Sequence, residues 1–370
     1  MADDRGSASR HFWKNWLIQD ALPLWSGVGF DSATGLVHEA LDHAGQVIVG
    51  LPRRFRVQAR QAYVFDTCRG LSLPAALEAR LDHCATALFA SLDARAFDPD
   101  TGHLVKTYAF DGSITEVAGD LYDLAFLFLA LSAGLSRGRD LSALKNKAEQ
   151  ALDALKDDLG WRENPHGLLP RRQNPHMHLF ESAMAMFRAT GEARYAAMAE
   201  ECLRLLREVF LQPDGRIFEF FSETWVPVPA DRQAVEPGHM AEWISLVHSY
   251  ERLFKQPSGV DLALLYKACR ALSCQDETVL PDRFLAGQSD FSRRLWPQSE
   301  WVRTHVTLAS AGHADAMARL PTLLSALGRD YLNPQVPGGW YDQRDAGGSL
   351  VSQNMPASTL YHLVEAILPL

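Results

Sequence analysis

Residues 236–250 read EPGHMAEWISLVHSY, a segment that opens with a turn and continues as a helix that is apolar on most sides. Pro237 and Gly238 are typical of a helix entrance. The apolar residues that follow indicate a helix buried nearly all round. His239 and Glu242 lie three residues apart near its start and so share one face, which packing alone does not explain. The segment is therefore a candidate buried helix and a candidate part of an active site.

Five further segments have the same character, polar at the start and apolar afterwards. They begin at Arg56, Gly119, Asn174, Leu295 and Asn354. With Glu236 included, successive starts are separated by 63, 55, 62, 59 and 59 residues. Amphipathic helical patterns lie between them, as in residues 74–94, 141–160 and 193–210. A nearly constant period of this size predicts stacked units, each with one inner and one outer helix.

Six such units that close on themselves predict an all-α fold, an (α/α)6 barrel of six inner and six outer helices. An open solenoid is the alternative, but it requires polar capping repeats, which neither end of the sequence shows. Short β-prone stretches at residues 106–112 and 215–221 stand beside turn residues, so we expect small β-hairpins at one mouth of the barrel. No linker divides the chain, and we predict a single catalytic domain over residues 1–370.

The composition argues against several functional classes. The net charge is −9 and basic residues do not cluster, so we expect no nucleic-acid partner. The longest apolar run, residues 124–135, is too short to span a bilayer, and the N-terminus lacks the apolar core of a signal peptide. We therefore expect a cytoplasmic protein without a membrane partner, and a homodimer is left open. The five cysteines are scattered without a CxxC motif, as reduced core residues would be.

Polar residues able to do chemistry recur in the first turns of four predicted inner helices. They are Arg60, then Asn174 with His176 and His178, then His239 with Glu242, then Gln298 with Glu300. Helices that run the same way would bring these turns to one mouth. A single histidine here is most often a satisfied core or capping residue, but the repetition favours a site. A carboxylate beside an imidazole orients it, although Glu242 also suits a helix N-terminus as a dipole partner or capping residue.

Several kinds of site lack their motifs. The spacing of His176 and His178 allows chelation only if the segment is non-helical, and no HExxH or cysteine ligand set is present. No GxSxG nucleophile and no phosphate-binding glycine loop occurs. We therefore expect imidazole and carboxylate acid/base chemistry without a metal or other cofactor. The aromatic residues that flank the site suit either a sugar platform or core filling: Trp243, Trp296, Trp340 and Tyr341.

The motifs RQAYVF, NPHMHLFE, EPGHMAEW, LWPQSE and STLYH, in this order, resemble the N-acylglucosamine 2-epimerase superfamily from about residue 13 to residue 368. The resemblance implies an (α/α)6 barrel that acts on free sugars without metal or nicotinamide. It makes His239 and His362 the acid/base pair, with Glu242 orienting or tuning His239. The residues that we expect to bind a monosaccharide substrate are Arg60, Asn174, His178, Trp296, Tyr108 and Glu300. His176 receives no role.

The wording of the motifs looks closest to the mannose-isomerase branch of that superfamily. We therefore expect reversible conversion of D-mannose to D-fructose, in which a histidine removes the C2 proton to give an enediol(ate). A sugar 2-epimerase acting on mannose/glucose or on N-acylhexosamines would use the same residues. More distant alternatives are a non-catalytic sugar-binding barrel and an inverting glycoside hydrolase that uses Glu242 with Asp120 or Glu300. Which histidine first takes the proton stays open.

Overall fold

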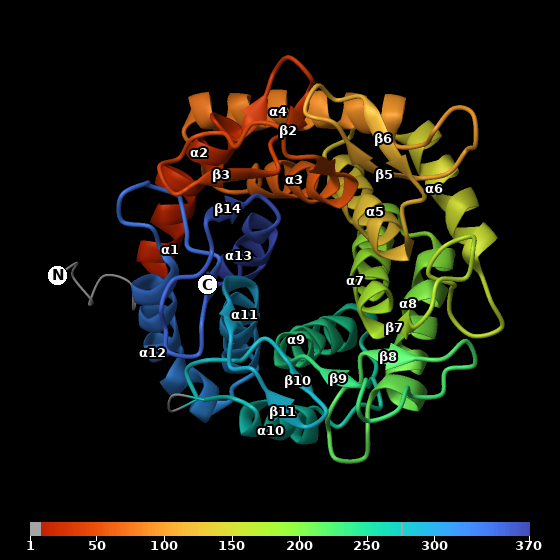
Figure 1. Ribbon diagram of the computed structural model, residues 1–370, viewed down its shortest axis with the longest axis vertical. Coiled ribbons are helices and arrows are strands. Elements are labelled where there is room, and N and C mark those ends of the chain that lie inside the picture. The colour runs from red at the N-terminus through yellow and green to blue at the C-terminus, as the bar shows by residue number, and fades with distance from the viewer. Residues whose placement is uncertain (1–8, 275–276) are drawn as a thin grey trace.

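The helices form two concentric layers around a central axis in the computed structural model, which describes residues 9–274 and 277–370 (Figure 1). The first eight residues, which entered the expectation about a signal peptide, lie outside this range. The inner layer contains α3 (Phe55–Cys68), α5 (Leu121–Ser136), α7 (Gln173–Thr190), α9 (Pro237–Phe254), α11 (Leu295–Ser310) and α13 (Thr359–Ile367). Each predicted inner segment contributes one of these helices. The predicted all-α (α/α)6 barrel is confirmed.

The outer layer closes the ring with a helix from the far end of the chain. Its members are α4 (Ala75–Arg95), α6 (Ser142–Leu155), α8 (Ala193–Leu205) with the π-helical turn η2 (Leu206–Phe210), α10 (Leu262–Ala271) and α12 (Ala314–Tyr331). The sixth position is filled by α1 (Arg10–Trp16), the π-helical turn η1 (Leu17–Ala21) and α2 (Leu22–Ser26). Because α1 packs beside α13, the first and last helices of the ring meet, and the solenoid alternative is excluded (Figure 1).

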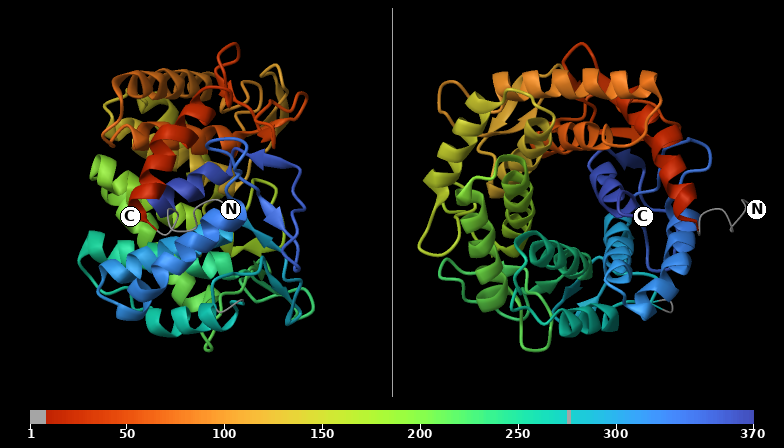
Figure 2. Two further views of the ribbon diagram at one scale, coloured as in Figure 1. Left: turned by 90° about the vertical axis from the view of Figure 1, so that its left-hand side faces the viewer. Right: turned by 180° about the vertical axis from the view of Figure 1, so that it is seen from behind.

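Short antiparallel strands gather at one mouth of the barrel, as expected (Figure 2, left). They are β1 (Phe30–Asp31) with β2 (Leu36–Val37), β3 (Ala40–Asp42) with β14 (Asn354–Pro356), β4 (Arg53–Arg54) with β5 (Val105–Tyr108) and β6 (Ile114–Val117), β7 (Arg171–Arg172) with β8 (Phe220–Phe221), β9 (Ala234–Val235) with β10 (Phe284–Leu285) and β11 (Gln288–Ser289), and β12 (Arg293–Arg294) with β13 (Gln343–Arg344). Strands β4, β7 and β12 each lead directly into an inner helix. They therefore fix the inner helix entrances at this mouth.

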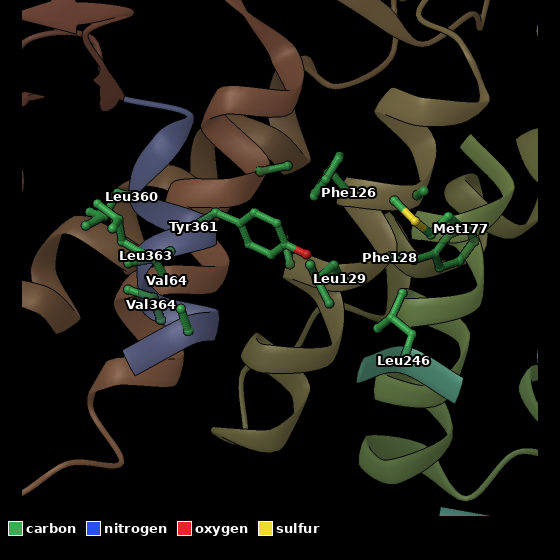
Figure 3. Packing of buried hydrophobic residues seen from close by; sticks show 14 of the residues in the cluster. Val64, Phe126, Phe128, Leu129, Met177, Leu246, Leu360, Tyr361, Leu363 and Val364 are labelled. Carbon is green, nitrogen blue, oxygen red and sulfur yellow. The ribbon is translucent and has the colours of Figure 1, made fainter. Parts of the chain in front are cut away.

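The inner helices are buried on almost every side because outer helices cover them and they also pack on one another. Figure 3 shows Tyr361 of α13 reaching towards Phe126 and Leu129 of α5, and the rings of Phe126 and Tyr361 are 5.4 Å apart in an edge-to-face arrangement. All five cysteines are free, and four of them are buried. Within the described ranges, no helix combines the length and the apolar character that crossing a membrane would require.

Candidate active site

A cavity of about 440 Å³ lies at the mouth where the inner helices begin. It brings together seven of the nine site residues that we predicted: Arg60, Asn174, His178, His239, Glu242, Trp296 and His362. These residues come from α3, α7, α9, α11 and α13. The inner helices thus run in one direction, and their first turns form one site.

Two histidines in this cavity are each held by a carboxylate. His239 Nδ1 lies 3.0 Å from Glu219 Oε1 and 3.6 Å from Glu236 Oε2. His362 Nδ1 lies 2.7 Å from Glu300 Oε1. A partner on Nδ1 fixes the ring and its tautomer. The Nε2 atoms make no hydrogen bond to the described residues and remain able to act on a substrate.

The surroundings push the pKa values of these two histidines in opposite directions. Burial alone would lower the pKa of His239, but the carboxylates of Glu219 and Glu236 outweigh it and raise that pKa above 6.5. Burial lowers the pKa of His362 well below 6.5, and the positive charge of Arg60 lowers it further. The surroundings therefore favour the protonated form of His239 and the neutral form of His362.

Trp296 lies between the two imidazoles. Its ring centroid is 5.0 Å from that of His239 and 5.4 Å from that of His362. Since it also lines the cavity, it offers an apolar surface that a sugar ring could contact beside the two histidines, and the Arg294 guanidinium lies over its ring at 5.4 Å.

Three further groups present unpaired polar atoms at the cavity. Asn174 Oδ1 and both carboxyl oxygens of Glu242 are buried without a hydrogen-bond partner in the described residues. Arg60 is 5% exposed and donates to Tyr122 Oη at 2.8 Å, but it has no carboxylate partner there. Buried polar atoms without partners are costly, so they are expected to be satisfied by a ligand or by water. They mark the places where sugar oxygens can bind.

The structure corrects the expectation that Glu242 orients His239. Glu219 of the loop beside β8 takes that position, and Glu242 Oε1 instead lies 3.7 Å from His178 Nδ1. Burial raises the pKa of Glu242 well above 4.5, and the neighbouring Glu300 and Glu181 raise it further. A helix spacing of three places Glu242 and His239 on one face, but it does not make their side chains meet.

Two predicted sugar-binding residues lie behind the cavity wall. Glu300 is fully buried and lies 2.7 Å from His362 Nδ1, so its side chain contacts a cavity residue and does not line the cavity itself. Tyr108 is 1% exposed and donates to the backbone carbonyl of Arg95 at 3.0 Å. It does not line the cavity, so the structure gives no support to its expected contact with substrate.

Sequence reasoning missed the side chains that position His239. Trp243 Nε1 donates to Gln173 Oε1 at 2.7 Å, and Gln173 Nε2 donates to Glu219 Oε1 and Oε2 at 3.1 and 3.0 Å. Trp243 is therefore a buried support rather than a sugar platform. The signal for Glu219 was weak, since it stands in a β-prone stretch that predicts only a hairpin. The cavity lining also contains Tyr122, Glu236, Arg294 and Asp342, which we did not predict.

The remaining polar and aromatic candidates have structural roles. His176 accepts from the Trp161 amide at 3.2 Å and contacts the Arg172 carbonyl at 3.1 Å, and burial lowers its pKa to about 3. Gln298 exchanges hydrogen bonds with the Leu280 backbone. Trp340 is buried and stacks on Trp25. These residues therefore stabilise the fold, and they do not line the cavity.

A buried ion network supports the floor of the cavity. Arg303 lies 3.1 Å from Glu181, 3.3 Å from Glu300 and 2.9 Å from Glu365. Glu181 Oε2 also accepts a hydrogen bond from Tyr361 and lies 3.3 Å from His178 Nδ1. Despite its burial, the pKa of Glu181 is lowered to about 2 by His178 and Arg303. These contacts hold the side chains of His178 and Glu300 in place.

Some of these side chains are close enough to hold a metal ion. The groups are His178, Glu181 and Glu242; Glu219, Glu236 and His239; and Glu242, Glu300 and His362. In each group the histidine also lies close to a carboxylate through Nδ1. The side chains of these three groups could therefore either bind a metal ion or act in imidazole acid/base catalysis.

Comparisons with known proteins agree with this architecture. The family model for N-acylglucosamine 2-epimerase (GlcNAc 2-epimerase) matches residues 35–366. A protein of Rhizobium meliloti (strain 1021) named mannose-6-phosphate isomerase is 33% identical over 374 residues, which is 95% of this chain and 94% of the relative. A solved D-mannose isomerase superposes with a TM-score of 0.85 at 19% identity, covering 98% of this chain and 97% of that chain. Cellobiose 2-epimerase from Spirochaeta thermophila DSM 6192 superposes equally well, with a TM-score of 0.85 at 19% identity, covering 97% and 95%.

The family match and the relative at 33% identity both extend over nearly the whole chain. The chain belongs to the N-acylglucosamine 2-epimerase family, and it is a sugar isomerase or epimerase.

Proposed function

We propose that this member of the family interconverts D-mannose and D-fructose by acid/base proton transfer. The observation that carries the proposal is the pair His239 and His362, which line one cavity with Trp296 between them and have pKa values shifted in opposite directions. Pairs of titratable groups separated in this way typically divide the roles of acid and base.

The neutral His362 is the base in this mechanism. After ring opening, its Nε2 takes the proton from C2 of the open-chain aldose, and the electrons of that C–H bond form the enediolate. The charge on the oxygen is offset by Arg60 and by the protonated His239, which donates a proton to it. His362 then returns its proton to C1 on the same face while His239, neutral after its donation, takes the proton of the C2 hydroxyl, which gives the 2-ketose and restores both histidines. No external oxidant or reductant is needed.

The charges at the mouth favour an unphosphorylated sugar. Arg54 is bonded to Glu39, and Arg294 is bonded to Asp282 through its backbone amide and lies 3.3 Å from it through Nε. The lining also contains carboxyl groups from Glu236, Glu242 and Asp342. A phosphate group would have to compete with Glu39 for Arg54 and with Asp282 for Arg294. This argument separates the proposed substrate from the one in the name of the Rhizobium meliloti relative.

The contacts of Asp120 and Glu300 do not support the acid pairs that the glycoside hydrolase alternative was expected to use. Asp120 is the N-cap of α5, is bonded to Arg172 and lines a different cavity, while Glu300 is bonded to His362. An inverting hydrolase requires two carboxyl groups that face each other across a glycosidic bond. An epimerase remains compatible with the site, because a protonated His239 could also deliver a proton to C2 from the other face.

The test is incubation of the enzyme with D-mannose in D₂O, followed by NMR, with mannose 6-phosphate in a parallel sample. Formation of fructose without glucose supports the proposal. Deuterium at C1 would show that the proton exchanges with solvent before it is returned, and its absence would show direct internal transfer. Glucose as the product would replace isomerisation by epimerisation. Turnover of mannose 6-phosphate in preference to mannose would overturn the argument from the charges at the mouth.

A further inference from the structure

A second cavity, of about 390 Å³, opens at the opposite mouth of the barrel, where the inner helices end. Figure 2 (right) shows the molecule from this side, away from the strands. Its walls include Arg188 in the last turn of α7 and Arg252 in the last turn of α9. Glu181 and Arg303 of the buried ion network also line it. The cavity is thus separate from the active site but lies against its supporting network.

The acids in this cavity already have partners. Glu181 and Glu365 are both bonded to Arg303, and Glu365 also accepts from Tyr63 Oη at 2.6 Å. Within the part of the chain that the structure describes, Arg188 and Arg252 have no ion pair and no hydrogen bond. At the active-site mouth, Arg54 and Arg294 each have an acidic partner, whereas Arg60 is hydrogen-bonded to Tyr122. The second cavity therefore carries uncompensated positive charge.

Cations in the last turn of a helix also interact with the helix dipole, which is the simplest explanation for each arginine alone. That explanation does not account for two unpaired arginines from neighbouring helices in one concavity, because they repel. Burial lowers the pKa of the Arg188 guanidinium, and the charge of Arg252 opposes the effect of nearby acids on it. His248, in the same lining, has a pKa lowered by burial and then by Arg252. An anion would relieve this repulsion.

The other lining groups suit an oxyanion. Ser249, Thr307 and Ser310 also line the cavity, and their hydroxyl groups donate to the Ser245 carbonyl, Ser245 Oγ and the Thr307 carbonyl, so each would have to rotate to donate to an anion. Two guanidinium groups supply planar sets of donors that match phosphate oxygens. The volume exceeds that of a phosphate ion and is in the range of sites for small organic molecules.

We propose that the cavity between the C-terminal ends of α7 and α9 binds a phosphate group, either as the inorganic ion or on a small phosphate ester. The inference does not depend on the proposed sugar reaction, because it concerns a different cavity and is tested by binding.

The test is isothermal titration of the full-length protein with inorganic phosphate and, in a separate series, with glycerol 3-phosphate. We expect Arg188→Gln and Arg252→Gln each to weaken binding by about tenfold or more, the usual effect of losing a charge-assisted hydrogen bond. Arg204→Gln removes an exposed arginine of α8 and serves as the matched control. Arg294→Gln tests whether the ligand binds at the active-site mouth instead. Both controls should bind as the parent protein does.

Binding of glycerol 3-phosphate alone would identify an ester as the ligand, and binding of inorganic phosphate alone would identify the free ion. The proposal fails if the parent protein binds neither probe, or if Arg294→Gln abolishes binding while Arg188→Gln and Arg252→Gln retain it. Thermal unfolding of each variant shows whether a loss of binding reflects a loss of folding.

Discussion

His362 Nδ1 and Glu300 Oε1 lie 2.7 Å apart, although the two residues belong to different helices and are 62 positions apart in the sequence. The contact directs Nε2 of His362 away from Glu300 and makes it available as a base. A carboxylate in this position also stabilises the imidazolium that forms when the base takes a proton.

Burial raises the pKa of Glu300 to about 7, and replacing Glu300 by Gln keeps the shape of the side chain while removing its ability to carry a negative charge. We expect kcat for the sugar reaction to fall by about 10²-fold, since the variant loses the group that supports the base in the transition state. The change in KM should be smaller, because Glu300 does not line the cavity. Steady-state kinetics check this, with thermal unfolding as the control for structure. An unchanged kcat would remove Glu300 from the mechanism.

Glu219 controls the upper pH limit of activity in the proposed mechanism. His239 must be protonated to act as the acid, so activity should fall as pH rises through its pKa, which the two neighbouring carboxylates raise. In Glu219→Gln that pKa should decrease, and the alkaline limb of kcat/KM should move to lower pH. Glu223→Gln, at an exposed position, is the control. An alkaline limb that stays in place in Glu219→Gln would contradict the assignment of His239 as the acid.

Arg303 is expected to be important for stability because it is buried among four carboxyl groups, those of Glu181, Glu242, Glu300 and Glu365. Arg303→Leu would leave these acids without their cation, and we expect a loss of about 3–5 kcal/mol in the free energy of unfolding. Arg216 forms an exposed ion pair with Asp214, and Arg216→Leu should cost less than about 1 kcal/mol. Urea denaturation of both variants measures the difference. Equal effects would show that burial does not set the importance of Arg303.

The fold could be predicted because the sequence pattern of the inner helices repeats at a nearly constant interval. Each inner helix needs an apolar surface on most sides, and this requirement recurs about every 60 residues. The sequence did not reveal that α1, η1 and α2 would supply the last outer helix, because their position depends on ring closure. The short strands were expected only as local hairpins, whereas β8 pairs with β7 from a distant stretch.

The site was predictable where its residues stand on the inner helix entrances, as His239, His178 and Arg60 do. Which of the site residues contact one another was harder to predict from the sequence. Glu219 contacts His239 across 20 residues and from a loop, and no spacing rule for helices connects them. Local reasoning instead paired His239 with Glu242, one helical turn away. The expectation for Tyr108 lacks support for a related reason, since the direction of a side chain on a two-sided strand cannot be read from one short segment.

Removal of metal ions tests whether the His and Glu clusters hold a catalytic metal ion or act in acid/base catalysis without one. Both candidate catalytic histidines are already bonded to carboxylates, and Arg303 already neutralises Glu181 and Glu300. We therefore expect full activity after dialysis against EDTA, with metal content verified by mass spectrometry. Loss of activity that Mn²⁺, Mg²⁺ or Zn²⁺ restores would show that one of the clusters holds a catalytic ion.

Gly238, in the turn that opens α9, packs directly against the ring that separates the two histidines. A Cβ atom at this position would lie 2.6 Å from Trp296 Cζ3 and 2.9 Å from Pro297 Cβ, closer than atoms can approach without movement. Gly238→Ala should therefore displace Trp296 and disturb the stacking surface between His239 and His362.

We expect kcat/KM of the Gly238→Ala variant to fall by roughly tenfold or more, because small misplacements of a bound substrate have large effects on rate. Helix propensity favours alanine over glycine by about 1 kcal/mol and partly offsets the cost of the close contacts, so thermal unfolding of Gly238→Ala is measured beside its kinetics. At Gly347 an added Cβ would meet nothing closer than 3.4 Å, and Gly347→Ala is the matched control. Normal kinetics in Gly238→Ala would mean that the position of Trp296 is not important for the reaction.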